Sequence, residues 1–330
     1  MRPLPPELAK IAREELNEIP ERVQEDLVIL RTWIYQQRYL YARTSTDFLI
    51  AFLRRCRYSL EQTKKRIDDF FTFHTKCPEI VTNRRVTEKM LSINRLGLQY
   101  FPEFPRCSDH AAIMITRLNC CPKRYHMRDV MAYTAMGMEL IALENDNAAI
   151  VGVIQIIDLS NLDVEHASQL GGGLLRKWWY WMNDCCPLRI NATYCLNAPK
   201  ELQNWLGVLR TLRVKMRPQF FILKSLEELY EHIPQKCLPE EYGGANGHMH
   251  ECVSYMEDLL KSYRDYFEDE VNYGTVEHLR HGEIMPYEAE FGAEGSFRKL
   301  DFRIKIIEKG ISYIYKYKYF HGNQVLEHYT

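Results

Sequence analysis

The sequence contains one pair of histidines at a spacing that metal proteins use. His248 and His250 are separated by one residue, and Glu251 and Cys252 follow directly. Structural zinc sites need four ligands, which normally come from two separated pairs. No matching second pair stands out in the sequence. We therefore interpret these histidines as polar residues near a helix start, and we expect no metal site.

Other residues resemble parts of catalytic sites without completing them. A dinucleotide site requires G-x-G-x-x-G directly after a strand, but the only glycine run near a strand, Gly171–Gly173, lies too far past it and lacks the spacing. Asp158 and His166 could be half of a catalytic relay, yet no nucleophile is placed by spacing. Phosphate-loop and nucleophile-elbow motifs are missing too. We expect no enzyme, no catalytic residues and no cofactor.

The order of predicted elements indicates the fold class. Val151–Asp158 is a nearly uninterrupted apolar run, typical of a strand that is covered on both faces. Strands and helices then alternate, which predicts an α/β fold with a mostly parallel sheet flanked by helices. The other predicted strands are Ala111–Leu118, Ala192–Leu196 and Gln219–Leu223, and the predicted helices of this region are His126–Glu144, Asp163–Cys186, Pro199–Met216, Leu226–Ile233 and Met249–Glu268.

The first third of the chain has a helical pattern instead. Apolar residues recur every three or four positions over residues 19–35. Thr46 or Asp47 can cap a second helix, and Ser59 with Gln62 fits a capping box for a third. We predict a helical domain over residues 1–95, a linker over Tyr100–His110, a sheet domain over residues 96–265 and a partly irregular C-terminal extension over residues 266–330.

Composition narrows the class of protein. The formal net charge is −1, which gives no argument for nucleic acid. The N-terminus has no apolar stretch typical of a secretory signal, and no window approaches the ~20 apolar residues that span a bilayer. Without a signal, the 10 cysteines are expected to be reduced. We predict a cytoplasmic, monomeric protein.

Several bulky side chains share faces around the predicted central strand. Methionine and tryptophan suit the walls of adaptable apolar cavities, although an ordinary core would use the same pattern. Gln155 favours the cavity, because a buried amide needs a partner and a ligand's polar end could supply one. The residues concerned are Met131, Thr134, Met138, Val153, Gln155, Ile157, Trp178, Trp181 and Met182.

A long window without acidic residues follows. From Leu202 to Leu226 the chain has no Asp or Glu, and an apolar helix pattern runs into a basic segment. This combination suits an anionic membrane surface, although a solvated helix end would also explain it. The basic residues that we assign to membrane contact are Arg210, Arg213, Lys215 and Arg217.

Several motifs, in this order and spacing, resemble the CRAL-TRIO family. They are FLIAFLRRCRYSLEQTKKRI (48–67), CPEI (77–80), GVIQIIDL (152–159), CCPLRINATYCLNAP (185–199) and LPEEYGG (238–244). The resemblance covers about residues 20 to 265. EGSFRKLD (294–301) is further similar to the tail of invertebrate members near the α-tocopherol-transfer and retinaldehyde-binding branch.

The resemblance implies a carrier of one hydrophobic small molecule, with a pocket between the sheet and its helices and a gate over Pro199–Met216. It adds Thr193, Trp205 and Val208 to the pocket. It also implies a phosphoinositide-binding site beside the gate, where Arg189 and Lys215 match two basic positions of the family. At two others Asn191 and Gln219 replace basic residues, and Cys56 stands where an arginine is common.

Our interpretation is therefore a cytoplasmic lipid-transfer protein that associates peripherally with membranes. We expect it to bind one retinoid, tocopherol, carotenoid or similar lipid and to exchange it at phosphoinositide-containing membranes. One alternative is phosphatidylinositol or phospholipid transfer. Another is a regulatory phosphoinositide-binding membrane module that carries nothing.

Overall fold

A computed structural model describes residues 2–81, 84–101, 111–170, 172–199 and 219–280. Its centre is a five-stranded sheet in the order β2-β3-β4-β5-β6, so chain neighbours are also sheet neighbours. Strands β3 to β6 run parallel, and β2 pairs antiparallel with β3. This confirms the predicted α/β class and the predicted strands. The strands are β2 (Gln99–Tyr100), β3 (Ala112–Arg117), β4 (Val153–Asp158), β5 (Ile190–Leu196) and β6 (Gln219–Ile222).

Each face of the sheet packs against its own hydrophobic cluster. Because β3, β4 and β5 follow one another in one direction, right-handed crossovers put the connecting helices on the same face. Val153 and Ile157 point into that cluster, whereas Ile154 and Ile156 point into the cluster on the other face. The helices between these strands are α7 (Met127–Glu144), α8 (Asp146–Val151), α9 (Val164–Gln169) and α10 (Gly172–Tyr180), followed by the π-helical turn η1 (Trp181–Cys185).

Two predictions about this region are wrong in detail. The single helix predicted over Asp163–Cys186 is divided into α9, α10 and η1, and the break falls at the glycine run, where helix propensity is lowest. The linker predicted to begin at Tyr100 begins later, because Tyr100 is fully buried and pairs with Ile115 in the sheet. Most of that predicted linker, and nearly all of the predicted gate helix, lies outside the described residues.

The N-terminal region is helical, as predicted. Its core contains a cluster of phenylalanines in which Phe48, Phe52, Phe70 and Phe71 are at most 1% exposed. Ser59 is the N-cap residue of α4, as predicted, but its side chain makes no capping bond. The cap predicted for the second helix is wrong, because Ser45 rather than Thr46 or Asp47 precedes α3. The helices are α1 (Pro6–Leu16), α2 (Pro20–Gln36), α3 (Thr46–Arg55), α4 (Leu60–Lys76), α5 (Pro78–Val81) and α6 (Glu88–Arg95).

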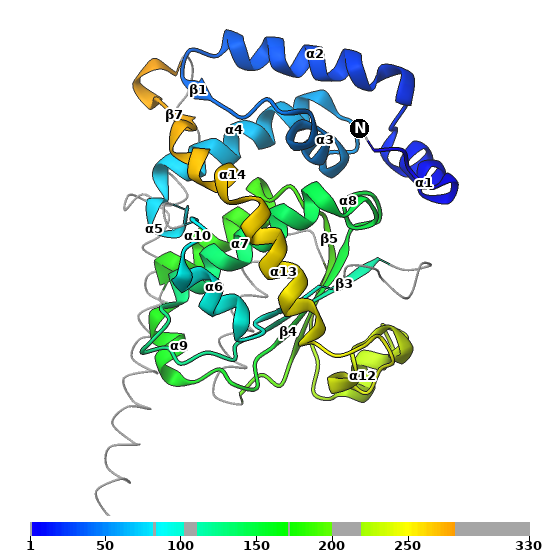
Figure 1. The fold of residues 1–330 in the computed structure, drawn as a ribbon, viewed down its shortest axis with the longest axis vertical. Coiled ribbons are helices and arrows are strands. Elements are labelled where there is room, and N and C mark those ends of the chain that lie inside the picture. The colour runs from blue at the N-terminus through cyan, green and yellow to red at the C-terminus, as the bar shows by residue number, and fades with distance from the viewer. Residues whose placement is uncertain (1, 82–83, 102–110, 171, 200–218, 281–330) are drawn as a thin grey trace, which may run out of the picture.

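After the sheet the chain covers its second face and then returns to the N-terminal helices (Figure 1). The short strand β7 (Gly274–Thr275) pairs antiparallel with β1 (Leu40–Tyr41). The elements on the way are α12 (Leu226–Tyr230), the 3-10 turns η3 (Gln235–Cys237) and η4 (Glu240–Tyr242), α13 (Glu251–Ser262), α14 (Arg264–Glu268) and η5 (Asp269–Asn272), and η6 (Glu277–Leu279) follows β7.

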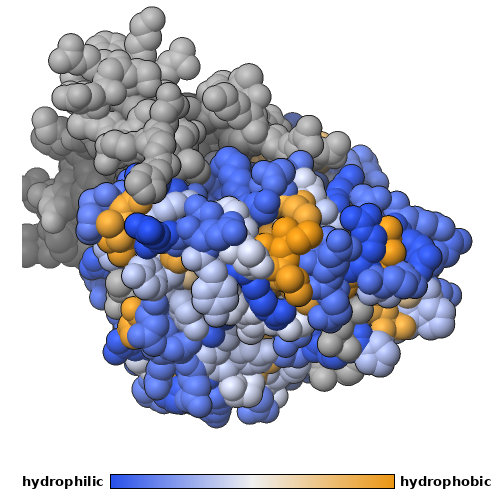
Figure 2. Space-filling view, turned by 90° about the horizontal axis from the view of Figure 1, so that it is seen from above, coloured by the Kyte–Doolittle hydropathy of each residue, from blue (hydrophilic) through white to orange (hydrophobic). Residues whose placement is uncertain are grey.

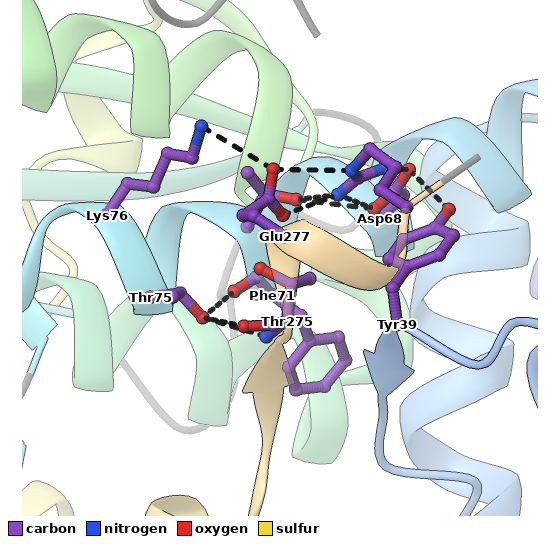
Figure 3. A network of polar contacts seen from close by, with 9 residues as sticks. Tyr39, Asp68, Phe71, Thr75, Lys76, Thr275 and Glu277 are labelled. Carbon is purple, nitrogen blue, oxygen red and sulfur yellow. Dashed lines mark hydrogen bonds and ion pairs between the residues drawn. The ribbon is translucent and has the colours of Figure 1, made fainter. Parts of the chain in front are cut away.

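Polar contacts fasten this returning segment to α4 (Figure 3). The Arg280 guanidinium donates to both carboxylate oxygens of Asp68 at 2.6 and 2.9 Å. The Tyr39 hydroxyl donates to the same carboxylate at 3.0 Å. The backbone N–H of Thr275 donates to the Thr75 hydroxyl at 2.8 Å. The last described residues are therefore an integral part of the helical region.

The motif LPEEYGG has a steric explanation. Gly243 has φ +72°, a backbone conformation that favours glycine, and a Cβ on Gly244 would lie 1.8 Å from the carbonyl oxygen of Leu238. Only glycine fits at the second position without moving the backbone. The turn holds η4 against the neighbouring loop, where Asn246 donates its backbone N–H to Leu238.

The cysteines and the surface complete the description. In the part of the chain that the structure describes, eight cysteines are free, but Cys237 is disulfide-bonded, which corrects the expectation that all are reduced. Among the described residues, no helix is both long and apolar enough to cross a membrane. The face seen from the α2 side is mainly hydrophilic with small separate hydrophobic patches (Figure 2).

Candidate ligand-binding site

Two adjoining hollows lie between the sheet and the helices on the face of α7 and α10. The larger has a cavity volume of about 130 Å³, and the smaller has one of about 40 Å³. They share a wall formed by Gln155 and Ile157 from β4 and by Trp178 and Trp179 from α10. Both are partly enclosed, and the lining of the larger is predominantly apolar. An apolar wall with a few polar groups is typical of sites that bind apolar small molecules.

The structure brings together most of the predicted pocket residues that it describes. The larger hollow is lined by Met131, Thr134, Gln155, Ile157 and Trp178. The smaller adds Met182 and Thr193, which come from η1 and β5. These placements follow from periodicity, because residues two apart on a strand and three or four apart on a helix share a face.

Three predicted pocket residues lie in the packed core instead. Met138, Val153 and Trp181 are 0% exposed and line neither hollow. Trp181 stacks on Trp178 with 5.2 Å between ring centroids, so it supports the wall from behind. Their side chains have the expected type and spacing, but the neighbouring elements fill the space in front of them. Trp205 and Val208 lie outside the described residues.

The structure adds lining residues that sequence reasoning missed. Cys195 and Phe220 come from β5 and β6, and Leu159, Leu162 and Leu170 come from the segment between β4 and α10. Strand alternation could have found Cys195, which lies two residues after Thr193. Arg55 and Asn183 line the smaller hollow from α3 and η1. No local sequence pattern predicts Arg55, because α3 is distant in sequence from the sheet.

Gln155 and Thr193 form a polar strip in this wall. The two residues are register partners in the parallel strands β4 and β5. The Thr193 hydroxyl donates to Oε1 of Gln155 at 3.3 Å. Gln155 is 4% exposed, and within the described part of the chain its amide nitrogen has no protein acceptor. That N–H group can donate to a ligand or a water in the hollow.

The basic residues give a different picture. Arg189 is largely buried and donates from Nη2 to the carbonyl oxygen of Ile150 at the end of α8. Burial first, and then the charge of Arg57, lowers the pKa of Arg189. An arginine in this position holds α8 against the start of β5, and its predicted contact with a phosphoinositide headgroup stays a prediction. Arg210, Arg213, Lys215 and Arg217 lie outside the described residues.

Asp158 and His166 both have structural roles. The Asp158 carboxylate accepts hydrogen bonds from the Tyr242 hydroxyl at 2.7 Å and from the Asn197 amide at 2.9 Å. His166 forms a reciprocal capping box with Asp163 at the start of α9. Asp158 thereby ties the end of β4 to the LPEEYGG turn, and His166 fixes a helix start. The structure does not bring the two together as a relay.

The histidine pair has a third neighbour that the sequence did not reveal. Possible ligand atoms of Glu241, His248 and His250 all lie within 4.8 Å of one another. The LPEEYGG turn brings the carboxylate to the histidines, which local spacing could not show. Glu241 already accepts the backbone N–H of Met249 at 2.9 Å, and His248 lies 3.2 Å from Glu240. The cluster could hold a cation, but these existing contacts also account for its geometry.

Comparison with known proteins identifies two domain models that match parts of this chain. Residues 95–244 match the model of the CRAL/TRIO domain, and residues 19–91 match the model described as Pinta-like, UBA domain. Residues 95–244 therefore form a CRAL-TRIO domain.

Named relatives span most of the chain. Alpha-tocopherol transfer protein-like from Mus musculus is 25% identical over 267 residues, which are 80% of this chain and 77% of the relative. Clavesin-1 from Xenopus laevis is 25% identical over 247 residues, which are 73% of this chain and 74% of the relative. The crystal structure of Sfh5 is 11% identical and covers 78% of this chain and 99% of Sfh5, with a TM-score of 0.41 that supports no conclusion.

Proposed function

We propose that this protein is a carrier, not an enzyme, for one apolar small molecule of retinoid, tocopherol or carotenoid size. We further propose that it exchanges this molecule at phosphoinositide-containing membranes as a cytoplasmic monomer. The observation that supports the carrier function most directly is the pair of hollows against β4, with their methionine, leucine and tryptophan walls. The name of the mouse relative, which mentions tocopherol transfer, points to the same ligand class.

The energetics are sufficient for such a ligand. Burying roughly twenty carbons at ~0.8 kcal/mol per CH₂ yields more than ~10 kcal/mol before costs. Association then costs several kcal/mol in lost translational and rotational freedom. The remainder is compatible with submicromolar binding even without a strong polar contact.

Native mass spectrometry of the purified full-length chain tests the proposal. A carrier should retain one apolar molecule per chain, and solvent extraction should release it for identification. A phospholipid in stoichiometric amount would favour phospholipid transfer over our proposal. A chain that remains empty even after incubation with retinol, α-tocopherol and β-carotene would contradict the carrier function and favour a membrane-binding module.

A bulky residue in the shared wall should prevent loading. Ile157 lines both hollows, so Ile157→Trp would fill the space where they meet. We expect at least a tenfold decrease in retained ligand, measured by native mass spectrometry, with an unchanged circular dichroism spectrum. The matched control is Ile154→Trp, because Ile154 lies on the same strand but packs on the other face of the sheet. Equal ligand retention in the two folded variants would show that the ligand binds elsewhere.

The basic residues at the end of the predicted gate should act in transfer rather than in affinity. Each Lys or Arg near an anionic surface contributes about 1 kcal/mol, which is enough to bias a gate that opens at a cost of a few kcal/mol. Reversing Arg213, Lys215 and Arg217 to Glu should slow ligand transfer to anionic vesicles several-fold and leave binding of free ligand unchanged. The wild-type transfer rate should also decrease as salt increases.

A matched triple reversal on the N-terminal helices controls for net charge. Lys10, Arg22 and Arg38 are exposed and lie on or beside α1 and α2. Changing these three to Glu alters the total charge equally, and we expect transfer to remain close to the wild-type rate. Transfer that is equally fast to neutral and anionic vesicles, at every salt concentration, would mean that the basic segment has no part in it.

A further inference from the structure

The smaller hollow has a cation in its wall that no described carboxylate neutralises. Arg55, at the end of α3, lines this hollow together with Gln155 and Thr193. Its only hydrogen bond within the described ranges runs from Nη2 to the carbonyl oxygen of Asn183, at 3.4 Å. Its Nε is buried without a partner. A buried N–H group without an acceptor is costly, and more so when the group is charged.

The surroundings of Arg55 increase this cost. Arg66 donates to the same Asn183 carbonyl oxygen at 2.8 Å, so one neutral acceptor serves two guanidinium groups. No ion pair with a carboxylate joins Arg55, Arg66 or Arg189 in the described part of the chain. Burial, followed by the charge of Arg66, lowers the pKa of Arg55 to about 10. Arg55 therefore still carries its charge at neutral pH.

The neighbouring residue Arg54 shows how a buried guanidinium is paired with carboxylates in this fold. Its guanidinium contacts both oxygens of Glu18, at 2.9 and 3.0 Å, and Asp146 at 2.6 Å. Two consecutive arginines of one helix thus have different partners. Arg54 is neutralised by carboxylates of the protein, whereas Arg55 lines a hollow and contacts no described carboxylate.

We propose that Arg55 binds the carboxylate of an amphipathic ligand whose apolar chain occupies the larger hollow. This inference rests on the proposed carrier function and specifies its ligand as a long-chain monocarboxylic acid. The planar donor fork of one guanidinium matches the two oxygens of a carboxylate. The Gln155 amide lines the same hollow and adds a second N–H donor. The apolar chain can continue past Ile157 and Trp178, which the two hollows share.

The geometry favours a carboxylate over a phosphodiester headgroup. The polar part of the lining consists of one guanidinium, two amides and one hydroxyl, and Trp178, Trp179 and Met182 flank it closely. A phosphodiester with a polar headgroup would need more donors and would place that headgroup against tryptophan. A carboxylate requires only two or three donors and ends the molecule there.

Fluorescence titration with cis-parinaric acid and with its methyl ester tests this inference on the full-length protein. The two probes share one apolar chain and differ in the charge of one end. We expect the wild type to bind the acid at least about tenfold more tightly than the ester, since a hydrogen bond to a charged group contributes on the order of a factor of ten or more. Arg55→Met should abolish this preference and leave the affinity for the ester within about twofold, while Arg55→Lys should retain part of the preference.

Arg66→Met is the matched control, because Arg66 donates to the same carbonyl oxygen but does not line the hollow. It should retain the preference for the acid, and the melting temperature of each variant confirms its folding. If the wild type binds acid and ester equally, or if folded Arg55→Met keeps the preference, this inference is wrong while the carrier function stands. If neither probe binds and no apolar molecule is retained, the carrier function itself fails. Recovery of a stoichiometric phospholipid would overturn the carboxylate assignment.

Discussion

Replacing Arg84 by methionine should lower the free energy of unfolding by about 3–5 kcal/mol, because it leaves two carboxylates of the interior without their cation. The Arg84 side chain is 0% exposed and lies 2.7 Å from the Glu139 carboxylate of α7. It also binds both oxygens of Glu270 on η5, and its Nη2 lies 3.3 Å from Nε2 of His74 on α4. One guanidinium thus joins the sheet domain, the C-terminal segment and the N-terminal helices.

Urea unfolding followed by circular dichroism measures this effect, and Arg95→Met is the matched control. Arg95 also bridges two carboxylates, those of Glu88 and Glu257, but all of these contacts are at the surface. Because water and salt screen such pairs, the control should unfold at nearly the wild-type urea midpoint. The double variant Arg84→Met/Glu139→Gln should recover part of the loss, since it removes one of the stranded charges. Equal midpoints for Arg84→Met and Arg95→Met would show that burial adds nothing to the strength of this contact.

The difference between these two arginines also shows which features could be predicted from the sequence and which could not. Local periodicity predicted the parallel strands, the helix α7 and the wall that contains Gln155 and Ile157, because residues that share a face recur at fixed intervals. The family motifs confirmed this order. Neither periodicity nor the motifs could show that Arg84 is buried and Arg95 exposed, or that Arg54 is neutralised and Arg55 is not. The partners that decide these roles are remote in sequence.

The same limit applies to the missed features of the site. Arg55 reaches the hollow from the N-terminal helices, and Glu241 reaches the histidine pair through a turn whose path depends on Gly244. Both depend on how separate segments pack. The opposite error occurred where a predicted pocket wall proved to be packed core. Side chains of neighbouring elements cover Met138, Val153 and Trp181. A pattern of side-chain types identifies a face, and only tertiary packing decides whether that face is core or cavity.

Acid should destabilise the wild type more than a variant that lacks one buried imidazole, His74. This residue lies on α4 between the ring of Phe70, with 4.3 Å between ring centroids, and the guanidinium of Arg84. Burial first, followed by the charges of Arg84 and Arg43, keeps the pKa of His74 well below its ordinary value of 6.5. Because Arg84 donates to Nε2, that nitrogen must act as an acceptor, and His74 is neutral in the folded protein.

The direction of the pH effect follows from proton binding in the two states. Above about pH 6.5 the imidazole is neutral in both the folded and the unfolded chain, so stability does not depend on it. Below that pH the unfolded chain takes up a proton that the folded protein cannot accept. Each further pH unit then lowers the free energy of unfolding by up to ~1.4 kcal/mol, or about 2 kcal/mol between pH 6.5 and pH 5.

His74→Gln separates this contribution from that of the other charged groups around the cluster. The amide oxygen of glutamine can still accept from Arg84 but does not titrate. Glu139, Glu270 and Arg43 also face this cluster, and they remain the same in both proteins, so their effects cancel in the difference. Urea unfolding at a series of pH values from 7.5 to 5 gives the free energy of unfolding of both proteins. The difference between them should change in favour of the variant only below about pH 6.5. If the two proteins lose stability in parallel over that range, His74 takes up its proton in the folded state and is not held neutral by Arg84.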